Sequence, residues 1–155
     1  MIKISMGLLD HQDIDLVGEE PPSFLEVENS DMISFHENVK YDLHASKVSN
    51  GVLVNGSISI AYDGVCGRCL KEFKGEAANK KLCLFIEDVT EQDLDITEDL
   101  RTELVMKLPV NCICSNDCKG LCHDCGVNLN EESCSCHEKS DEDSPWAALD
   151  DLDVE

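Results

Sequence analysis

The sequence predicts an α+β fold in which an antiparallel β-sheet or open barrel-like core carries one or two helices and a C-terminal cysteine-rich, zinc-knuckle-like loop. Three observations predict this fold. Two runs of alternating apolar residues flank an Asn-Gly turn signal within residues 38–62. Apolar residues at helical spacing begin near Thr97. Cysteines occur in close pairs, at 66 and 69, 114 and 118, 122 and 125, and 134 and 136.

The N-terminal part of the chain predicts a hairpin after a stretch that is hard to interpret. The segment IKISMGLL at 2–9 fits a strand, and VGEEPPSFLEVE at 17–28 fits a loop or a sheet edge because it contains two consecutive prolines. The hairpin is predicted because apolar and polar residues alternate on both sides of SNG at 49–51. Its inward-facing residues would be Val39, Tyr41, Leu43, Ala45, Val52, Val54, Ile58, Ile60 and Tyr62.

A third strand and a helix are predicted further along the chain. KKLCLFIED at 80–88 alternates as a strand, within which we interpret Cys83 as a small buried apolar residue. The acidic segment 87–99 predicts an exposed loop. A helix is expected near 97–108, capped by Thr97 and ended by Pro109, since Leu100, Leu104 and Leu108 recur at helical spacing.

These elements predict three segments in a chain of 155 residues. Residues 1–110 would form the β-rich core domain with its helix, residues 111–137 a cysteine-rich metal-binding segment, and residues 138–155 an acidic tail. Ser144 and Pro145 predict the start of a short helix in that tail, which would place Trp146 and Leu149 on one face.

The net charge of −21 limits the classes of partner. A surface this acidic repels nucleic-acid phosphates and anionic membranes, so it favours a basic protein partner or serves solubility. The start of the chain lacks the features of a signal peptide, and no stretch approaches the roughly 20 apolar residues that span a bilayer. We therefore expect a cytoplasmic location without membrane contact, where reduced cysteines indicate metal or redox chemistry.

The cysteine spacing predicts a structural metal site. Zn²⁺ prefers four tetrahedral ligands and binds thiolates well, and the stretch that carries these cysteines is too polar to fold by burial alone. The first choice of ligands is Cys122, Cys125, Cys134 and Cys136, and a second site from Cys66, Cys69, Cys114 and Cys118 is the further hypothesis. His123 or His137 as a substitute ligand, and iron in place of zinc, are alternatives.

The pair Cys66 and Cys69 also raises the alternative of a thioredoxin-like dithiol. Such a site needs the first thiol at the start of a helix that follows a strand within a βαβ unit. The residues upstream of Cys66 predict a hairpin, and a metal-like loop follows Pro109. Both features favour the metal interpretation over redox catalysis.

Several ordered motifs resemble the YceD family of large ribosomal RNA subunit accumulation proteins. They are CGRCLKEF at 66–73, the acidic stretch before a helix that ends in KLPV at 107–110, CSNDCKGLCHDCGVNLNEESCSC at 114–136 and PWAALDDL at 145–152. The resemblance implies a non-enzymatic ribosome-biogenesis factor that supports processing or accumulation of large-subunit (23S-type) ribosomal RNA. It leaves open whether precursor RNA or a basic ribosomal protein is the contact.

Two partner surfaces follow as hypotheses. Five of the twelve basic residues fall within 68–81, where they could meet RNA phosphate, or else be solvated lysines of a strand edge. Alternatively, the acidic segments 87–99 and 131–155 could hold a basic ribosomal protein, or the tail could be a disordered solubilising end. The residues proposed to contact RNA or a partner are Arg68, Lys71, Phe73, Lys74, Lys80, Lys81 and Trp146.

No catalytic motif is evident, and the five histidines do not form a metalloprotease spacing. We therefore expect neither an enzyme nor a small-molecule substrate. Besides the ribosomal role, the alternatives are a zinc-binding acidic adaptor that acts outside the ribosome and a CxxC thiol-redox protein.

Overall fold

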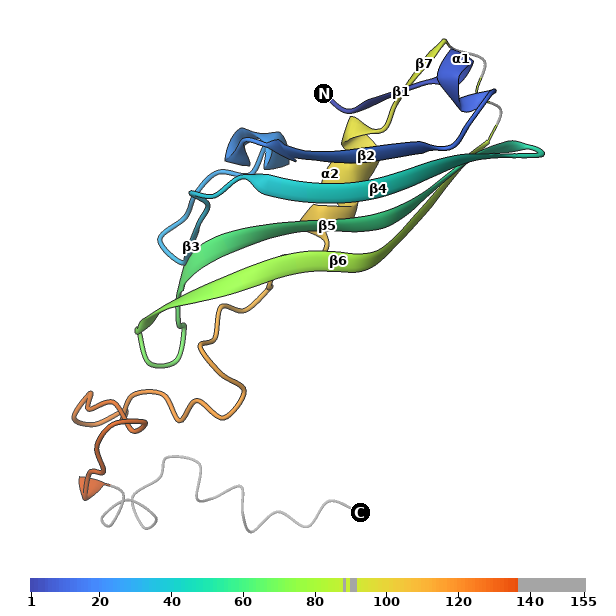
Figure 1. Cartoon of the computed structure of the whole chain (residues 1–155). Coiled ribbons are helices and arrows are strands. Elements are labelled where there is room, and N and C mark those ends of the chain that lie inside the picture. The colour runs from blue at the N-terminus through green and yellow to red at the C-terminus, as the bar shows by residue number, and fades with distance from the viewer. Residues whose placement is uncertain (88, 90–91, 137–155) are drawn as a thin grey trace, which may run out of the picture.

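The computed structural model describes residues 1–87, 89 and 92–136, and its strands dominate the chain (Figure 1). The predicted α+β class is confirmed: curved antiparallel strands are accompanied by helices and followed by a cysteine-rich segment. The elements in order are β1 (Lys3–Ser5), α1 (Met6–Leu9), β2 (Ile14–Glu20), the 3-10 helix η1 (Pro22–Leu25), β3 (Ile33–Ser34), β4 (Val39–Val48), β5 (Gly51–Val65), β6 (Glu72–Glu87), β7 (Asp93–Asp95) and α2 (Thr97–Val105).

The main sheet is an antiparallel arrangement in the order β2-β4-β5, with β6 on the other side of β5. Strands β4 and β5 form the predicted hairpin, in which Val48 pairs with Gly51 across the turn residues Ser49 and Asn50. The short strand β3 pairs with the end of β5 beyond β4. In Figure 1 the long strands twist together and extend toward the cysteine-rich segment, which lies beyond the β5–β6 connection.

The alternation that predicted the hairpin separates the two faces of the sheet. Its apolar face packs against α2, which lies behind the strands in Figure 1, and against the small β1–β7 pair. Burial of this face removes apolar surface from water and is the main source of stability for the fold. The buried residues of this core include Val39, Leu43, Ala45, Val52, Val54, Ile58, Ile60, Ala77 and Leu82 from the sheet, Ile96, Leu100 and Leu104 around α2, and Ile4 and Leu25 from the N-terminal part of the chain.

Glycines allow the long strands to approach closely. Gly56 lies at a register irregularity between β5 and β6 with φ of 152°, and a Cβ there would be 2.1 Å from the carbonyl oxygen of Asp42. Elsewhere an aromatic ring covers the glycine on the neighbouring strand. Tyr62 lies over Gly75 and Phe73 over Gly64, and these two rings meet edge to face with centroids 6.3 Å apart. The rings cover backbone that glycine leaves open.

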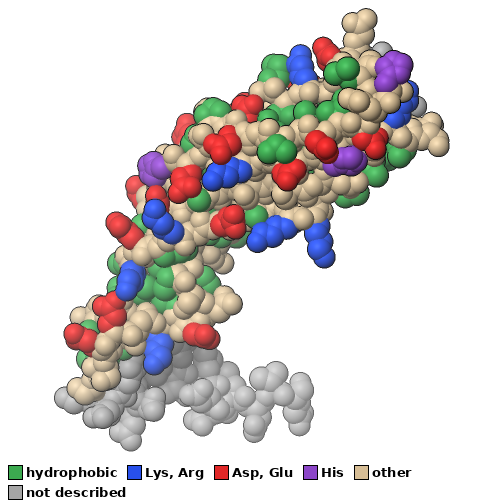
Figure 2. All heavy atoms as spheres, viewed as in Figure 1, with side chains coloured by type: hydrophobic (Ala, Val, Ile, Leu, Met, Phe, Trp, Pro, Cys, Tyr) green, Lys and Arg blue, Asp and Glu red, His purple; other side chains and the backbone are tan. Residues whose placement is uncertain are grey.

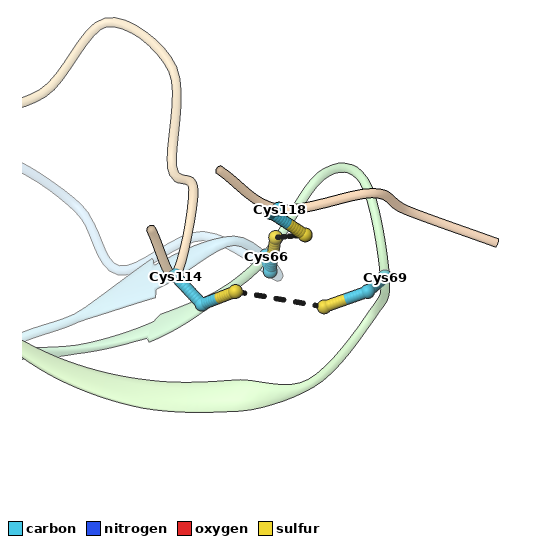
Figure 3. Close-up of side chains that lie close together, drawn as sticks. All are labelled: Cys66, Cys69, Cys114 and Cys118. Carbon is cyan, nitrogen blue, oxygen red and sulfur yellow. Dashed lines mark hydrogen bonds between the residues drawn. The ribbon is translucent and has the colours of Figure 1, made fainter. Parts of the chain in front are cut away.

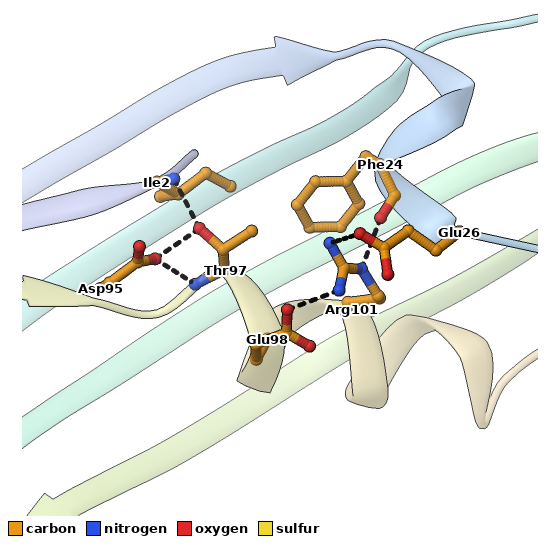
Figure 4. A network of polar contacts seen from close by, with 7 residues as sticks. All are labelled: Ile2, Phe24, Glu26, Asp95, Thr97, Glu98 and Arg101. Carbon is orange, nitrogen blue, oxygen red and sulfur yellow. Dashed lines mark hydrogen bonds and ion pairs between the residues drawn. The ribbon is translucent and has the colours of Figure 1, made fainter.

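Arg101 fastens α2 to the N-terminal part of the chain (Figure 4). Its side chain is only 15% exposed, and its Nε donates to the carbonyl oxygen of Phe24 at 2.7 Å. Its other guanidinium nitrogens pair with Glu26 at 2.9 Å and with Glu98 at 2.6 Å. The guanidinium carbon also lies 5.7 Å from the centre of the Phe24 ring. One charged group thus supplies a donor to the part-buried carbonyl of Phe24 and pairs with two exposed carboxylates.

The observed helix begins at Thr97 as predicted, but it ends earlier and is capped differently. Helix α2 ends at Val105 rather than near residue 108, so it stops before Pro109. Thr97 is the first helical residue rather than the cap, because Asp95 accepts hydrogen bonds from both the backbone N–H and the hydroxyl of Thr97 at 3.0 and 2.5 Å. The Thr97 oxygen instead accepts the backbone N–H of Ile2 at 2.8 Å, which ties β1 to the helix (Figure 4).

Other local predictions were incomplete or wrong. IKISMGLL contains α1 as well as β1, and the predicted loop 87–99 contains β7, which pairs with β1. The segment 17–28, predicted as a loop or a sheet edge, contains η1 and the end of β2, which is indeed an edge strand of the main sheet. The predicted strand 80–88 is only the second half of β6. Cys83 is exposed rather than buried, because it points away from the face that carries Leu82. The short helix predicted in the tail lies outside the described residues.

The helices of the described residues are all too short or too polar to cross a membrane.

Replacing Arg101 with methionine should lower the free energy of unfolding by about 2–3 kcal/mol, because the carbonyl of Phe24 loses a charged hydrogen-bond donor. Urea unfolding of the full chain measures this change. Lys40→Met removes an exposed cation from β4 and serves as the matched control. Equal losses in the two variants would contradict the anchoring role of Arg101.

Candidate metal centres

The first cluster joins the β5–β6 connection to the C-terminal segment. Cys66 and Cys69 follow β5, and Cys114 and Cys118 come from residues far along the chain (Figure 3). The sulfurs of Cys66 and Cys118 are 3.8 Å apart, and those of Cys69 and Cys114 are 3.7 Å apart. The four sulfurs all lie within 4.8 Å of one another, and three of these cysteines are at most 5% exposed. The structure therefore brings together the quartet that the sequence offered as a second site.

Backbone contacts hold this first cluster in place. The N–H of Gly67 donates to the carbonyl of Cys112 at 2.8 Å, and the N–H of Leu121 donates to the carbonyl of Arg68 at 3.0 Å. Gly120, with φ of 78°, lets the two segments approach, since a Cβ there would be 3.2 Å from the Arg68 carbonyl oxygen. The cysteine-rich segment is thereby fixed to the end of the sheet.

The second cluster lies within the C-terminal segment itself. The sulfurs of Cys122, Cys125, Cys134 and Cys136 all lie within 4.8 Å of one another, as the first choice of ligands requires. An isolated antiparallel bridge between Leu121 and Asn128 closes the loop that carries the first pair. Cys122 is 3% exposed, whereas Cys125 is exposed, so the second cluster is more accessible than the first.

The two CxxC turns share one backbone pattern. In the first turn, the N–H of Cys66 donates to the carbonyl of Lys71 at 2.9 Å, and the N–H of Leu70 donates to the carbonyl of Cys66 at 2.8 Å. In the second turn, the N–H of Cys122 donates to the carbonyl of Val127 at 2.8 Å, and the N–H of Gly126 donates to the carbonyl of Cys122 at 2.9 Å. Each turn thus directs its two thiols to one side.

The residue after the second cysteine takes a left-handed conformation in both turns. Gly126 has φ of 73°, which costs glycine little. Leu70 holds the equivalent position with φ of 57°, where a side chain is strained, and it is 62% exposed. The first turn therefore keeps an exposed apolar residue at a position that favours glycine.

The spacing of the sulfurs suits a tetrahedral metal ion. With metal–sulfur bonds of about 2.3 Å, as for zinc, neighbouring thiolates of a tetrahedral site stand about 3.8 Å apart. The separations of 3.8 and 3.7 Å in the first cluster match this value and exceed the roughly 2.05 Å of a disulfide. Both quartets can hold a metal ion, and all ten cysteines are free thiols.

The pKa values of Cys66 and Cys114 in the first cluster are shifted in opposite directions. Burial raises the pKa of Cys66, but N–H groups of Cys114, Cys69 and Arg68 donate to its sulfur and bring that pKa to about 6. The hydrogen bond with Cys118, together with burial, raises the pKa of Cys114 to about 12. Four sulfurs this close cannot all ionise without a cation, so these thiols share protons where a metal would otherwise balance their charge.

The second cluster repeats this arrangement. Backbone N–H groups of Cys125 and Asp124 lower the pKa of Cys122 to about 6 against the effect of burial. The hydrogen bond with Cys125, followed by burial, raises the pKa of Cys136 to about 12. Each cluster therefore contains at least one thiol whose anion neighbouring hydrogen-bond donors already favour, Cys66 and Cys118 in the first and Cys122 in the second, and the anion is the state that binds a metal.

Residues outside the two quartets support the first centre. The side-chain amide of Asn130 donates to the sulfur of Cys118 at 3.4 Å, and its oxygen accepts the N–H of Lys119 at 2.8 Å. Such contacts orient a metal ligand and favour its charged form. Sequence reasoning missed Asn130, because only folding brings its amide to that sulfur.

The redox alternative fits this geometry poorly, whereas the histidine alternative is only partly tested. His123 belongs to neither group of four sulfurs, but its ring and Asp124 form a third group with Cys122 whose ligand atoms lie within 4.8 Å of one another. His137 lies outside the described residues. Cys66 ends a strand, and its turn leads into β6 rather than into the helix that a thioredoxin-like dithiol needs. Both thiols of that pair are also nearly inaccessible to a disulfide substrate.

The structure separates the basic residues proposed for partner contact. Arg68 donates to the carbonyl of Cys118 at 3.1 Å and thus supports the first cluster. Lys71 pairs with Glu131 at 3.1 Å, and Lys74 lies 3.8 Å from Asp63. Lys80 and Lys81 lie farther along β6, beside a shallow depression on the outer face.

The apolar residues proposed for contact have equally distinct places. Phe73 is half-buried against Tyr62 and Gly64 rather than open for stacking. Trp146 lies outside the described residues. On the face drawn in Figure 2, basic side chains are interspersed with acidic ones, and contact of these residues with RNA or a partner stays a prediction.

Comparison with known proteins confirms the resemblance to the YceD family. Residues 83–153 match the family model described as Large ribosomal RNA subunit accumulation protein YceD. The matched stretch includes α2 and six of the eight clustered cysteines, those at 114, 118, 122, 125, 134 and 136.

Curated relatives extend the similarity toward the N-terminus. An uncharacterised protein of Mycobacterium tuberculosis is 35% identical over 123 residues, which are 70% of this chain and 58% of the relative. One from Mycobacterium leprae is 30% identical over 132 residues, 76% of this chain and 59% of the relative. The chain thus spans somewhat over half the length of these relatives.

A plant relative carries a descriptive name. The Arabidopsis thaliana protein named Large ribosomal RNA subunit accumulation protein YCED homolog 1, chloroplastic, is 36% identical over 45 residues, 29% of this chain and 14% of the relative. No solved structure matches the chain.

The wild-type chain should bind about two equivalents of zinc, since each quartet supplies four thiolates. Cys69→Ser and Cys125→Ser should each retain one equivalent, and the double variant none, as measured by elemental mass spectrometry on purified protein. Cys83→Ser, which changes a cysteine outside both quartets, should retain two. Loss of a metal in Cys83→Ser, or a metal-free wild type, would refute the two-centre assignment.

Glycine at position 70 and leucine at position 126 should change the stability of the two CxxC turns in opposite directions. Leu70→Gly should stabilise the first turn by about 0.5–1 kcal/mol, and Gly126→Leu should destabilise the second by about 1–2 kcal/mol, because a side chain is strained in this conformation. Zinc retention during titration with a chelator measures both changes. A shift of the same sign in the two variants would contradict this account.

Proposed function

We propose that this chain supports the accumulation of large-subunit (23S-type) ribosomal RNA as a binding factor without catalytic activity of its own. The observation that carries the proposal is the match of residues 83–153 to the YceD family, over a stretch that contains the whole second cluster and half of the first. The printed name of the plant relative assigns large ribosomal RNA subunit accumulation to that protein. The cytoplasmic location expected from the sequence stays a prediction.

We further propose that both clusters hold structural zinc. Zinc suits closed sites of four thiolates, and a closed site leaves no coordination position for a substrate. In the first centre the ligands would be Cys66, Cys69, Cys114 and Cys118, which are largely buried. The role of the metal would be to hold the cysteine-rich segment rigidly against the sheet, so that its surface is presented in one orientation.

A basic ribosomal protein is the partner that the charge distribution favours. The chain carries a net charge of −21, and contacts within the molecule already engage Arg68 and Lys71. Binding to RNA gains affinity mainly from cations at phosphates, and this surface offers few of them in one place. A basic protein would instead be attracted by the acidic surface and could be held before it joins the precursor particle.

In a bacterial strain that lacks this protein, we expect the ratio of 23S to 16S ribosomal RNA to fall and the wild-type chain to restore it. The variant Lys74→Glu/Lys80→Glu/Lys81→Glu should restore the ratio as well, because RNA phosphate is not the proposed contact. Quantification of total ribosomal RNA measures both results.

The variant Cys66→Ser/Cys118→Ser is compared with the lysine variant. It should fail to restore the ratio of 23S to 16S ribosomal RNA, because it removes two ligands of the first centre. An unchanged ratio in the deletion strain would overturn the proposed function. Failure of the lysine variant, with its fold and zinc content intact, would instead identify direct RNA contact as the mode of action.

A further inference from the structure

The two outer edges of the main sheet are protected to different degrees. A free strand edge offers unpaired N–H and C=O groups to another chain, and proteins commonly block such edges with lysine or with irregular pairing. Strand β6 has both devices, since Lys80 and Lys81 fall at its register irregularity with β5. Strand β2 forms the opposite edge and has neither within residues 14–20.

The edge of β2 is regular and has unpaired backbone groups. All seven residues of β2 pair with β4 without a break, from Ile14 opposite Ala45 to Glu20 opposite Val39. In an antiparallel pair every second residue directs its N–H and C=O away from the partner strand. Among the described residues, none outside β4 forms a backbone hydrogen bond with β2. A regular edge with unpaired backbone groups, suited to one more strand, therefore lies on this side of the sheet.

The outward-facing side chains of β2 give this edge a defined chemistry. Asp15, Val17 and Glu19 are exposed and alternate with the inward-facing residues of the strand. Val17 is 75% exposed, so this strand presents one apolar side chain between two carboxylates. Beside it lies a shallow depression of about 290 Å³ whose lining includes Glu19 and Ser57. The order along the edge is acidic, apolar, acidic.

Neighbouring charges only partly neutralise this edge. Asp15 lies 2.7 Å from Nδ1 of His44, and Asp13 lies 3.7 Å from Nε2 of the same ring. Asp10, which lies before β2, pairs with Lys47 of β4. Glu19 accepts a hydrogen bond from the neutral amide of Asn38 at 3.2 Å, and Lys40 lies opposite Glu19 in the pairing of β2 with β4.

We propose that β2 is a docking edge for an extended, lysine- or arginine-rich segment of a partner protein, which adds to the sheet as a further strand. Main-chain hydrogen bonds to β2 would provide the attachment, and alternate side chains would provide selectivity. The partner strand would place cations beside Asp15 and Glu19 and a small apolar residue beside Val17. That the segment belongs to a ribosomal protein rests on the proposed function, whereas the docking edge itself does not.

A second copy of this chain is a poorer occupant. Antiparallel pairing of two β2 strands about Val17 would bring Asp15 of one copy against Glu19 of the other, and like charges in directly opposed positions destabilise a sheet. The charge of the edge therefore selects a basic segment over self-association.

The test uses the full, metal-loaded chain and the capped peptide Lys-Thr-Val-Thr-Lys as a probe. Binding measured by calorimetry should weaken by about tenfold or more in Val17→Lys, because the new cation guards the edge and repels the peptide. Phe85→Lys places the same charge at the protected edge β6 and should leave affinity within about twofold. Amide hydrogen exchange should slow in β2 when the peptide binds.

A peptide with the same side chains but alternate backbone nitrogens methylated separates strand addition from charge attraction, since it keeps the cations and loses the donors. We expect it not to bind. Equal binding of the methylated peptide, peptide protection at β6 alone, or dimerisation of the chain through β2 would overturn the proposal. These measurements involve no ribosomal RNA, so a negative result would not contradict the proposed function. Conversely, an unchanged ribosomal RNA ratio would not contradict the docking edge.

Discussion

The approach of Cys66 and Cys69 to Cys114 and Cys118 determines how the two halves of this molecule are joined. The first pair belongs to the β5–β6 connection, and the second begins the cysteine-rich segment. Apolar packing at this junction is slight compared with the core between the sheet and α2. The backbone bonds of Gly67 and Leu121 set the geometry, but four adjacent thiols need a cation before they can all become anions. In the proposed zinc-bound state, a metal ion would let all four thiols ionise and would fix the orientation of the segment.

The sequence alone predicted those parts of the fold in which one physical signal dominates. The β4–β5 hairpin followed from strict alternation and its turn, and the α+β class followed from that hairpin and one helix. Sequence patterns did not predict the elements whose formation depends on tertiary contacts. β6 begins early because Tyr62 and Phe73 cover glycines that weaken the strand pattern, and β7 forms in an acidic stretch because β1 pairs with it. Cys83 resembles a core residue in composition, but its position in the alternation directs it outward.

For the candidate site as well, the sequence predicted the grouping of residues within one segment but not the contacts between distant segments. Spacing within the chain sufficed to group Cys122 with Cys125, Cys134 and Cys136, because all four lie within one short segment. Spacing could not show that Cys66 meets Cys118, since 52 residues separate them and the sheet must form first. Basic residues close in sequence were likewise separated by folding: Arg68 supports the metal segment, and Lys80 lies well along β6. Neither the contact of Asn130 with sulfur nor the open edge of β2 has a signature in composition.

X-ray absorption at the zinc edge of the purified wild-type chain tests the central claim most directly. Two closed thiolate centres predict that every zinc has four sulfur neighbours at about 2.3 Å and no nitrogen or oxygen neighbour. The same spectrum from Cys69→Ser should show the four-sulfur environment for the zinc that remains, because the second centre is intact. Nitrogen or oxygen in the first shell of the wild-type protein, or an average of fewer than four sulfurs, would contradict the account.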